Sequence, residues 1–318
     1  MKRALITGGT GFVGANLARR LLADGCEVHL LVRPEFQDWR IRSVQDDLRL
    51  WTVAVEDADG VGGAVAAIKP DTVFHLAAHG AYPHQTDRHA MFEMNVLGTR
   101  NVVTAGLAAD VGSLVIAGSS SEYGRRSEPH RESDEPRPES DYARTKAAAT
   151  AWCSWKARES GAAITTLRLY SVYGPWEEPT RLIPRLIVEG RQGRRPPLAD
   201  PTTARDFVYV DDVVEAFLLA SRKSDPGVGA VYNIGTGRQT TLADAVRAAD
   251  ELFGIKSEPA WVSMPDRSWD TSAWVADCRL IREELGWEPK VGFGEGLRKT
   301  LDWYESESAV HEFYEATE

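Results

Sequence analysis

The chain has 318 residues, of which 43% are hydrophobic and 26% charged, as in a globular protein that buries a core. Its net charge of −10 argues against a nucleic-acid or anionic-membrane surface, since phosphate partners need a basic face. The three cysteines lie far apart and no metal-ligand spacing occurs, so we expect reduced thiols and no metal site. No run approaches the roughly 18 apolar residues of a membrane span, and the apolar run near Met1 is too short for a signal peptide. A cytoplasmic protein is expected.

The first half of the chain alternates short apolar runs with helical patterns. Because these runs are apolar nearly throughout, they predict strands that are buried on both faces. The predicted strands are Ala4–Thr7, Glu27–Val32, Trp51–Val55, Thr72–Leu76, Leu114–Ala117 and Ile164–Leu169. Strand–helix–strand alternation is typical of an α/β fold, here a doubly wound, Rossmann-like parallel sheet.

Helical patterns fill the spaces between these strands and continue into the second half. The predicted helices are Phe12–Ala23, Arg88–Ala109, Tyr142–Glu159, Asp211–Ser221, Leu242–Phe253, Asp277–Leu285 and Gly294–Tyr304. After Tyr170 the strand rhythm stops. We therefore expect one domain over residues 1–170, to which segments around 205–235 return, and a smaller α/β lobe over 171–318. The polar stretch Arg125–Ser140 predicts a solvated loop.

A glycine-rich turn follows the first predicted strand. Gly8 permits a tight turn, Gly11 lets the backbone approach a pyrophosphate, and Gly14 allows close helix–strand packing. The following helix would offer its first N–H groups and a partial positive charge to the phosphate. Three glycines can also mark a plain turn, but their place at the first strand–helix junction favours a dinucleotide-binding domain.

The end of the second strand bears on the choice between NAD and NADP. A carboxylate there would bind the ribose hydroxyls and repel a 2′-phosphate. This strand instead runs into Arg33-Pro34, and an arginine can pair with a 2′-phosphate through its planar fork. The sequence therefore favours NADP(H). The alternative is a solvated Arg33 beside NAD.

Tyr142 and Lys146 form a YxxxK pair within a predicted helix. A four-residue step places both side chains on one helix face, one turn apart. The ammonium can stabilise the phenolate, so the pair could exchange a hydroxyl proton while hydride moves to or from a nicotinamide. Ser119 ends the fifth strand, at the edge where parallel sheets bind ligands, and could hydrogen-bond the reacting oxygen. Without the tyrosine–lysine pair, a serine-rich turn would be the simpler interpretation.

Together these motifs resemble the extended short-chain dehydrogenase/reductase family, in particular its nucleotide-sugar epimerases, dehydratases and 4-ketoreductases. The resemblance covers nearly the whole chain. The motifs that carry it are the segments 8–14, 75–78, 95–99, 118–124, Tyr142 with Lys146, Arg168 to 174–175, 205–207, 232–237 and 285–289.

The resemblance implies roles for individual residues. Tyr142 would be the acid/base, Lys146 its tuner and ribose ligand, and Ser119 the hydroxyl that orients the substrate oxygen. Arg205 and Arg267 would bind the nucleotide diphosphate of a nucleotide-sugar substrate, although either could be a surface arginine. The cofactor contacts would be Gly8, Gly11, Phe12, Val13, Gly14, Arg33, Asp57 near the adenine, Ala77 and Ala78, besides Tyr142 and Lys146. A homodimer through the helices Arg88–Ala109 and Tyr142–Glu159 would follow the family habit.

The loop after the fifth strand separates the reactions of this family. Its 4,6-dehydratases carry acids where this chain has Ser120 and Ser121, and hydroxyls serve poorly for elimination of water, so a dehydratase is disfavoured. Glu122 comes one position late. Ser120, Ser121 and Ser171 are candidate substrate contacts, with Ser171 replacing the asparagine of many relatives. His79 and Tyr82 would line the sugar or nicotinamide site, or would be ordinary loop residues.

Three functions remain open. The favoured one is NADP(H)-dependent reduction of a 4-keto group on a nucleotide-linked 6-deoxysugar, because no acid stands at the tip of the second strand. The second is an NAD-dependent nucleotide-sugar 4-epimerase acting on a UDP-hexose or UDP-uronate. The third is a non-catalytic dinucleotide sensor, in which loss of Tyr142 or Lys146 would be expected.

Overall fold

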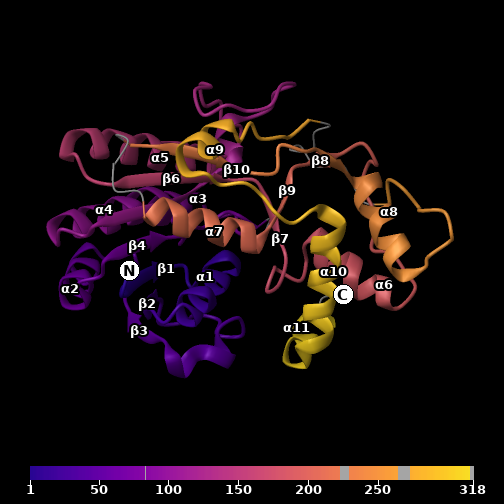
Figure 1. Cartoon of the computed structure of the whole chain (residues 1–318), viewed down its shortest axis with the longest axis horizontal. Helices are drawn as coiled ribbons and strands as arrows, with labels where there is room; N and C mark the ends of the chain where they lie inside the picture. Colours follow the sequence, from indigo (N-terminus) through magenta and orange to yellow (C-terminus); the bar gives the residue numbers. More distant parts are fainter. Residues whose placement is uncertain (83, 223–228, 264–272, 316–318) are drawn as a thin grey trace.

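A seven-stranded parallel sheet forms the centre of the protein (Figure 1). The computed structural model describes residues 1–82, 84–222, 229–263 and 273–315. The strand order is β10-β6-β5-β4-β1-β2-β3. The strands are β1 (Arg3–Thr7), β2 (Glu27–Val32), β3 (Arg49–Thr52), β4 (Thr72–His75), β5 (Ser113–Ser119), β6 (Ile164–Leu169) and β10 (Val231–Ile234). The order reverses between β1 and β4, which opens a crevice at the carboxyl edge of the sheet. The predicted fold class is confirmed.

Helices cover both faces of this sheet. One face carries α1 (Phe12–Ala23) and α7 (Val210–Ser221), and the other carries α2 (Ala58–Ile68), α4 (Thr99–Ala108) and α5 (Asp141–Ser160). In β5, the Val115 side chain packs on the face covered by α1 and α7. The side chains of Leu114 and Ile116 pack on the face covered by α2, α4 and α5. Two buried faces explain why the strands are apolar throughout. Among the described helices, none combines the length and apolarity that crossing a bilayer requires.

The helix predicted over Arg88–Ala109 is interrupted by a π-helical turn. It consists of α3 (Arg88–Phe92), the π-helix η2 (Glu93–Gly98) and α4. A π-helical turn inside an α-helix often marks a functional position. Here it contains the fully buried Asn95, which contacts the candidate site.

The predicted strand Trp51–Val55 is misplaced. β3 spans Arg49–Thr52, and Thr52 pairs with Val32 at the end of β2. β3 is the edge strand, and its residues are exposed or partly exposed, so its apolar residues do not mark its limits. The predictions for α1 and for α8 (Leu242–Phe253) have the correct bounds, and the other helices differ at their ends.

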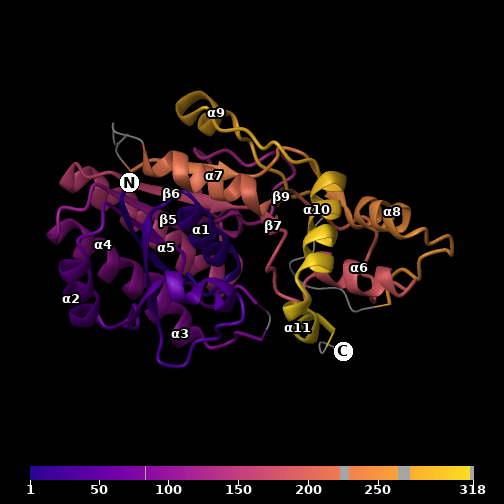
Figure 2. The ribbon, with the colours of Figure 1, turned by 60° about the horizontal axis from the view of Figure 1, so that its bottom comes forward.

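The second half of the chain forms short strand pairs and a helical cluster beside the sheet (Figures 1 and 2). β7 (Ser171–Tyr173) pairs with β9 (Phe207–Tyr209), and β8 (Ala204–Arg205) pairs with β11 (Thr240–Thr241). The cluster contains α6 (Leu182–Arg191), α8, α10 (Phe293–Ser306) and α11 (His311–Glu315), while α9 (Arg279–Leu285) packs on β10. β10 is a segment that returns to the main sheet, and the division into domains at residue 170 stays a prediction.

The segment between β2 and β3 contacts the helical cluster at the end of the chain. The Trp39 ring stacks on Phe313 with centroids 5.3 Å apart. The buried Arg40 donates from Nε to Trp176 O at 2.8 Å and pairs with Glu178 at 2.9 Å. Part of the first half is therefore built into the packing of the second.

The sequence predicts a solvated loop over Arg125–Ser140. The structure differs, because part of this stretch is buried. His130 is fully buried, and its backbone pairs with the segment 275–277. Its ring stacks on Tyr123 with centroids 4.9 Å apart, and Nδ1 lies 2.8 Å from the Tyr170 hydroxyl. The polar composition of the stretch hides this one anchoring residue.

His75 links β1, β4 and α4 through a buried chain of hydrogen bonds. The Thr99 hydroxyl donates to Asn95 O at 2.7 Å, so it must accept from His75 Nε2 at 2.9 Å. His75 Nδ1 then accepts from the Thr7 hydroxyl at 2.7 Å. The ring is therefore neutral with its proton on Nε2. Burial, with Lys146 nearby, lowers the pKa of His75 to about 3.

This lowered pKa predicts a loss of stability in mild acid. Below the ordinary pKa of about 6.5 the unfolded chain protonates His75, whereas the folded chain does not until about pH 3. For this residue alone, the free energy of unfolding should fall by about 2 kcal/mol between pH 7.5 and pH 5. Urea unfolding at both pH values should show that His75→Gln loses less than the wild type by this amount. The exposed His84→Gln should behave like the wild type; equal losses in all three proteins would refute the assignment.

Candidate active site

The candidate site is built on the glycine turn between β1 and α1, at the carboxyl edge of the sheet. Gly8 has a φ of +70°, and a Cβ there would lie 2.6 Å from Ala77 N. A Cβ on Gly14 would lie 2.2 Å from Gly8 O. The turn therefore packs directly against the end of β4 and against its own helix, and only glycine fits at these two positions.

The amino end of α1 is free to bind an anion. Its N-cap is Gly11, no side chain caps it, and the first turn carries no acid. The first-turn amides of Phe12, Val13 and Gly14 have no acceptor within the helix, and the helix dipole adds positive charge. These residues fit a dinucleotide pyrophosphate, as their sequence predicts.

The loop after β4 is held against this turn by Asn95. Its side chain accepts from His79 N at 2.8 Å and donates to His79 O at 2.8 Å and to Thr145 Oγ1 at 2.9 Å. Ala77 N donates to the Thr7 hydroxyl at 3.3 Å. Ala77 and Ala78 consequently lie between the glycine turn and α5, and both are partly exposed. Asn95 belongs to a motif noted in the sequence, but its bridging role was not foreseen.

Arg33 and Asp57 are both engaged with the protein. Arg33 lies at the tip of β2, half-exposed, and pairs with Glu56 at 3.1 Å, so a 2′-phosphate would have to share its guanidinium with this carboxylate. The Asp57 side chain caps α2 by accepting from Gly60 N at 3.0 Å. Its expected place near the adenine stays a prediction. Glu56 was missed, although it directly precedes Asp57.

Tyr142, Ser119 and Lys146 meet at the end of β5. Burial raises the pKa of Tyr142 to about 12, and the nearby Ser119 side chain opposes this shift. Lys146 is buried and donates to Ala117 O at 2.5 Å. Burial lowers the pKa of Lys146, and Glu122 opposes this. An ammonium has three N–H donors, so two remain beyond the bond to Ala117 among the described residues. The arrangement can move a proton to or from a bound hydroxyl.

The buried Glu122 side chain fixes the backbone of Ser119. Its carboxylate, fully buried, accepts from Ser119 N at 2.9 Å, from Thr150 Oγ1 at 3.0 Å and from Arg168 Nε at 2.8 Å. Arg168 also donates to the Tyr123 hydroxyl at 2.8 Å. Glu122, which comes one position late for the acid of a dehydratase, is thus engaged by three donors. It holds the carboxyl end of β5 in place.

The other two serines differ in their surroundings. Ser121 Oγ lies 2.8 Å from Ser119 Oγ and is partly exposed. Ser120 is buried and accepts from Trp274 Nε1 at 3.0 Å. Ser121 therefore shares the site with Ser119, whereas the Ser120 side chain is used in anchoring Trp274.

The remaining predicted substrate contacts are scattered around this centre. Tyr82 is partly buried and close enough to Tyr142 to raise its pKa. Ser171 lies at the start of β7 and is partly buried. Arg205 lies on β8, partly buried, and donates to Ala204 O at 2.7 Å. Arg267 lies outside the described residues. In the described ranges no group of three or more histidine, cysteine or acidic residues is placed to hold a metal.

Two charged residues near the phenol were not foreseen. Arg181 lowers the pKa of Tyr142, and Glu177 lies 3.6 Å from Arg181. Glu177 is buried, and burial raises its pKa to about 8. The sequence marks this segment only by its flanking prolines, which indicate a loop and not a cluster of charges.

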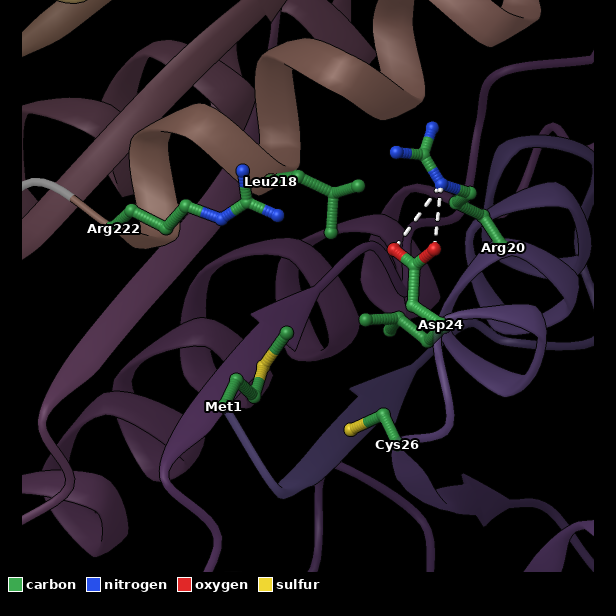
Figure 3. A pocket seen from close by; sticks show the side chains of 7 residues that line it. Met1, Arg20, Asp24, Cys26, Leu218 and Arg222 are labelled. Atoms are coloured by element: carbon green, nitrogen blue, oxygen red, sulfur yellow. Dashed lines mark hydrogen bonds and ion pairs between the residues drawn. The ribbon is translucent and has the colours of Figure 1, made fainter.

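A separate hollow of about 390 Å³ lies at the opposite edge of the sheet (Figure 3). It is lined by Met1, Arg20, Leu21, Asp24, Cys26, Leu218 and Arg222. Figure 3 shows Arg20 bonded to Asp24, at 3.2 Å, and not directed at a common centre with Arg222. The hollow adjoins the amino ends of β1 and β2, so it is not part of the candidate site.

The chain matches the family described as "NAD dependent epimerase/dehydratase family" over residues 4–235. It is 30% identical to the UDP-glucose 4-epimerase of Mycolicibacterium smegmatis, covering 96% of this chain and 99% of that one. It is 26% identical to a trifunctional UDP-glucose 4,6-dehydratase/UDP-4-keto-6-deoxy-D-glucose 3,5-epimerase/UDP-4-keto-L-rhamnose-reductase of Arabidopsis thaliana, over 95% of this chain. The chain spans about half of that enzyme, 47%.

Solved structures agree with this family. The Thermus thermophilus UDP-glucose 4-epimerase in complex with NAD superposes with a TM-score of 0.84 at 32% identity, covering 95% of this chain and 99% of that one. MoeE5, solved with UDP-glucuronic acid and NAD, gives 0.83 at 33% identity, covering 96% and 99%. The fold, the glycine turn and the tyrosine–lysine pair thus occur together in a chain that resembles dinucleotide-dependent enzymes along its whole length.

The tight glycine turn predicts a specific sensitivity at Gly14. Gly14→Ala should lower the melting temperature and raise the Kd for dinucleotide at least about tenfold, because its Cβ would collide with Gly8 O. The control is Gly63→Ala in α2, where a Cβ meets nothing within 4 Å. It should leave binding unchanged and add about 0.5–1 kcal/mol of stability. Thermal unfolding and calorimetric titration measure both effects, and equal behaviour of the two variants would contradict the geometry.

Proposed function

The chain belongs to the NAD-dependent epimerase/dehydratase family, and we propose that it inverts the 4-hydroxyl of a nucleotide-linked sugar by reversible oxidation at that carbon. The observation that supports this proposal is the end of β5, where Tyr142 lies near Ser119 and Lys146 donates to Ala117 O two residues earlier on the same strand. Such a site can take the proton from one sugar hydroxyl and give it back, while hydride leaves the same carbon and returns to its opposite face, as epimerisation through a ketone requires.

The residues divide the work as follows. Bound dinucleotide supplies the hydride acceptor and donor. The Tyr142 oxygen exchanges a proton with the sugar hydroxyl, and the Ser119 hydroxyl holds the sugar oxygen in place. Because burial raises the pKa of Tyr142, its phenolate needs a nearby positive charge. Arg181 already lowers this pKa, and we assign the second positive charge to Lys146, one helical turn along α5. The two remaining N–H donors of Lys146 suit ribose hydroxyls.

Two observations support epimerisation over elimination of water. Ser120 and Ser121 offer no carboxylate, and Glu122 is occupied by Arg168, Thr150 and Ser119 N. A second acid for removing water is thus absent from these three positions of the described loop. Two relatives of comparable length are UDP-glucose 4-epimerases. The enzyme of Mycolicibacterium smegmatis is 30% identical to this chain, and that of Thermus thermophilus is 32% identical.

NADPH-dependent reduction of a 4-keto-6-deoxysugar is the second candidate. The observation that favours it is Arg33 at the tip of β2, where no carboxylate stands. A non-catalytic dinucleotide sensor is not proposed, since it would not need the intact serine, tyrosine and lysine.

For the substrate we propose a nucleoside diphosphate sugar with Arg205 and Arg267 at its phosphates. MoeE5 with UDP-glucuronic acid and the UDP-glucose 4-epimerases make a UDP-hexose or UDP-uronate the first choice to assay.

Tyr142→Phe tests the chemistry directly. The variant should still bind dinucleotide, but its kcat for interconverting UDP-sugar C4 epimers should fall about 10²–10⁴-fold, because the exchanged proton has no carrier. Proton NMR of UDP-glucose and UDP-glucuronic acid incubated with the enzyme, without added reductant, measures the reaction. Tyr232→Phe is the control, because Tyr232 lies in the core and its hydroxyl bonds Glu284 on α9. Turnover only when NADPH and a 4-keto sugar are supplied would replace the proposal with the ketoreductase.

We also propose a homodimer formed through the helical segment 88–109 (α3, η2 and α4) and α5. Two of the few large apolar side chains that are exposed in the described residues, Phe92 on α3 and Trp155 on α5, lie on these helices, each 49% exposed. Light scattering after size exclusion should give twice the chain mass of 35.1 kDa, and Trp155→Glu should shift the protein toward monomer. A Val262→Glu variant, at 60% exposure in another region, should stay dimeric. A monomeric wild type would disprove the proposal.

A further inference from the structure

The Arg33–Glu56 pair occupies the position where a dinucleotide specificity residue is expected. Arg33 follows β2, and Glu56 comes from the loop between β3 and α2. The guanidinium of Arg33 lies 3.1 Å from Glu56 Oε1 and 3.4 Å from Met94 Sδ. Arg33 is 49% exposed and Glu56 is 28% exposed, so both can meet a ligand.

Glu56 is held in place by its neighbours. The buried Asn101 donates from Nδ2 to Val55 O and to Glu56 O, both at 3.1 Å. Val53 N donates to Val32 O at 2.9 Å, which ties this loop to the end of β2. The carboxylate is therefore presented by a fixed backbone.

One oxygen of this carboxylate is unsatisfied. Glu56 Oε2 is buried and has no hydrogen-bond partner among the described residues. A buried acceptor without a donor costs about 1–3 kcal/mol, and more when it is charged. Because Oε2 is covered by protein atoms, a ligand hydroxyl would reach it only after the Glu56 side chain turns toward the crevice, and the new bond would then remove this cost.

The pair adjoins the predicted dinucleotide turn. β2 neighbours β1 in the sheet, and a Cβ on Gly9 would lie 2.5 Å from a methyl group of Leu30. On the other side, His79 after β4 feels both charges, since Arg33 lowers its pKa and Glu56 raises it. The ends of four neighbouring strands thus surround the pair.

We propose that Glu56 makes this chain select NAD over NADP. Its carboxylate neutralises Arg33 and would lie next to a 2′-phosphate, which carries a charge of about −1.5 to −2 near pH 7. The 2′-hydroxyl of NAD can instead donate to Glu56. Glu56 thus supplies from the β3 loop the carboxylate that β2 lacks. The inference rests on the dinucleotide binding that the proposed function requires.

Binding measurements on the full chain test this without relying on turnover. NAD and NADP are titrated calorimetrically into protein freed of bound nucleotide, for the wild type, Glu56→Gln, Arg33→Met and the double variant. The wild type should bind NAD at least about tenfold more tightly than NADP, the size of one charged hydrogen bond. Glu56→Gln should weaken NAD and tighten NADP, each by several-fold to about tenfold. The double variant should lose the gain for NADP, because that gain comes from the freed Arg33.

A matched control and the contrary outcomes make the test decisive. Glu35→Gln removes the same charge from an exposed position two residues after Arg33, and it should leave both affinities within about twofold. Glu56→Asp, which keeps the charge but shortens its reach to Arg33, serves if Glu56→Gln fails a circular-dichroism check of folding. A ratio of affinities that is the same in the wild type, Glu56→Gln and Glu56→Asp would overturn the inference while leaving the proposed function standing. Absence of any dinucleotide binding to the wild type would overturn both.

Discussion

The ion pair between Glu122 and Arg168 is the contact on which the catalytic end of the sheet depends. Both groups are buried, and the carboxylate is satisfied by Ser119 N, Thr150 and Arg168. A buried carboxylate is stable only when it is paired and fully hydrogen-bonded. Because its donors come from β5, α5 and β6, the pair fixes three elements at once. The position of the Ser119 hydroxyl relative to the phenol follows from that arrangement.

A second group of buried hydrogen bonds fixes the ends of β1 and β4, beside the glycine turn. His75 joins β1, β4 and α4 through two threonine hydroxyls, and Asn95 joins the following loop to α5. The glycine turn packs on the end of β4 without room for side chains. Apolar packing brings the strands together, but it does not specify where the loops at their ends lie. These few buried hydrogen bonds give the edge of the sheet a single geometry.

Much of this could be predicted from sequence, because the periodic and motif signals are local. The bounds of α1 and α8, the parallel sheet, and the position of Tyr142 near Ser119 at the end of β5 follow from spacing and strand ends. β3 was misplaced because an exposed edge strand carries no clear apolar pattern. The partner of Arg33 could not be foreseen, since Glu56 lies 23 residues away on another strand's loop. The cluster of Glu177 and Arg181 depends on a loop whose path no local signal records.

The contacts of Trp39 with Phe313 and of Arg40 with Glu178 have a consequence for exchanging the second half of the chain. Grafting the part of a relative that corresponds to residues 171–318 onto residues 1–170 of this chain would remove Phe313 and Glu178 from the two side chains they cover. Arg40 would then keep a buried guanidinium with no carboxylate opposite it, a defect of several kcal/mol. A working chimera therefore has to exchange the segment between β2 and β3 together with the second half of the chain. The residues to be exchanged are thus not one continuous stretch of the sequence.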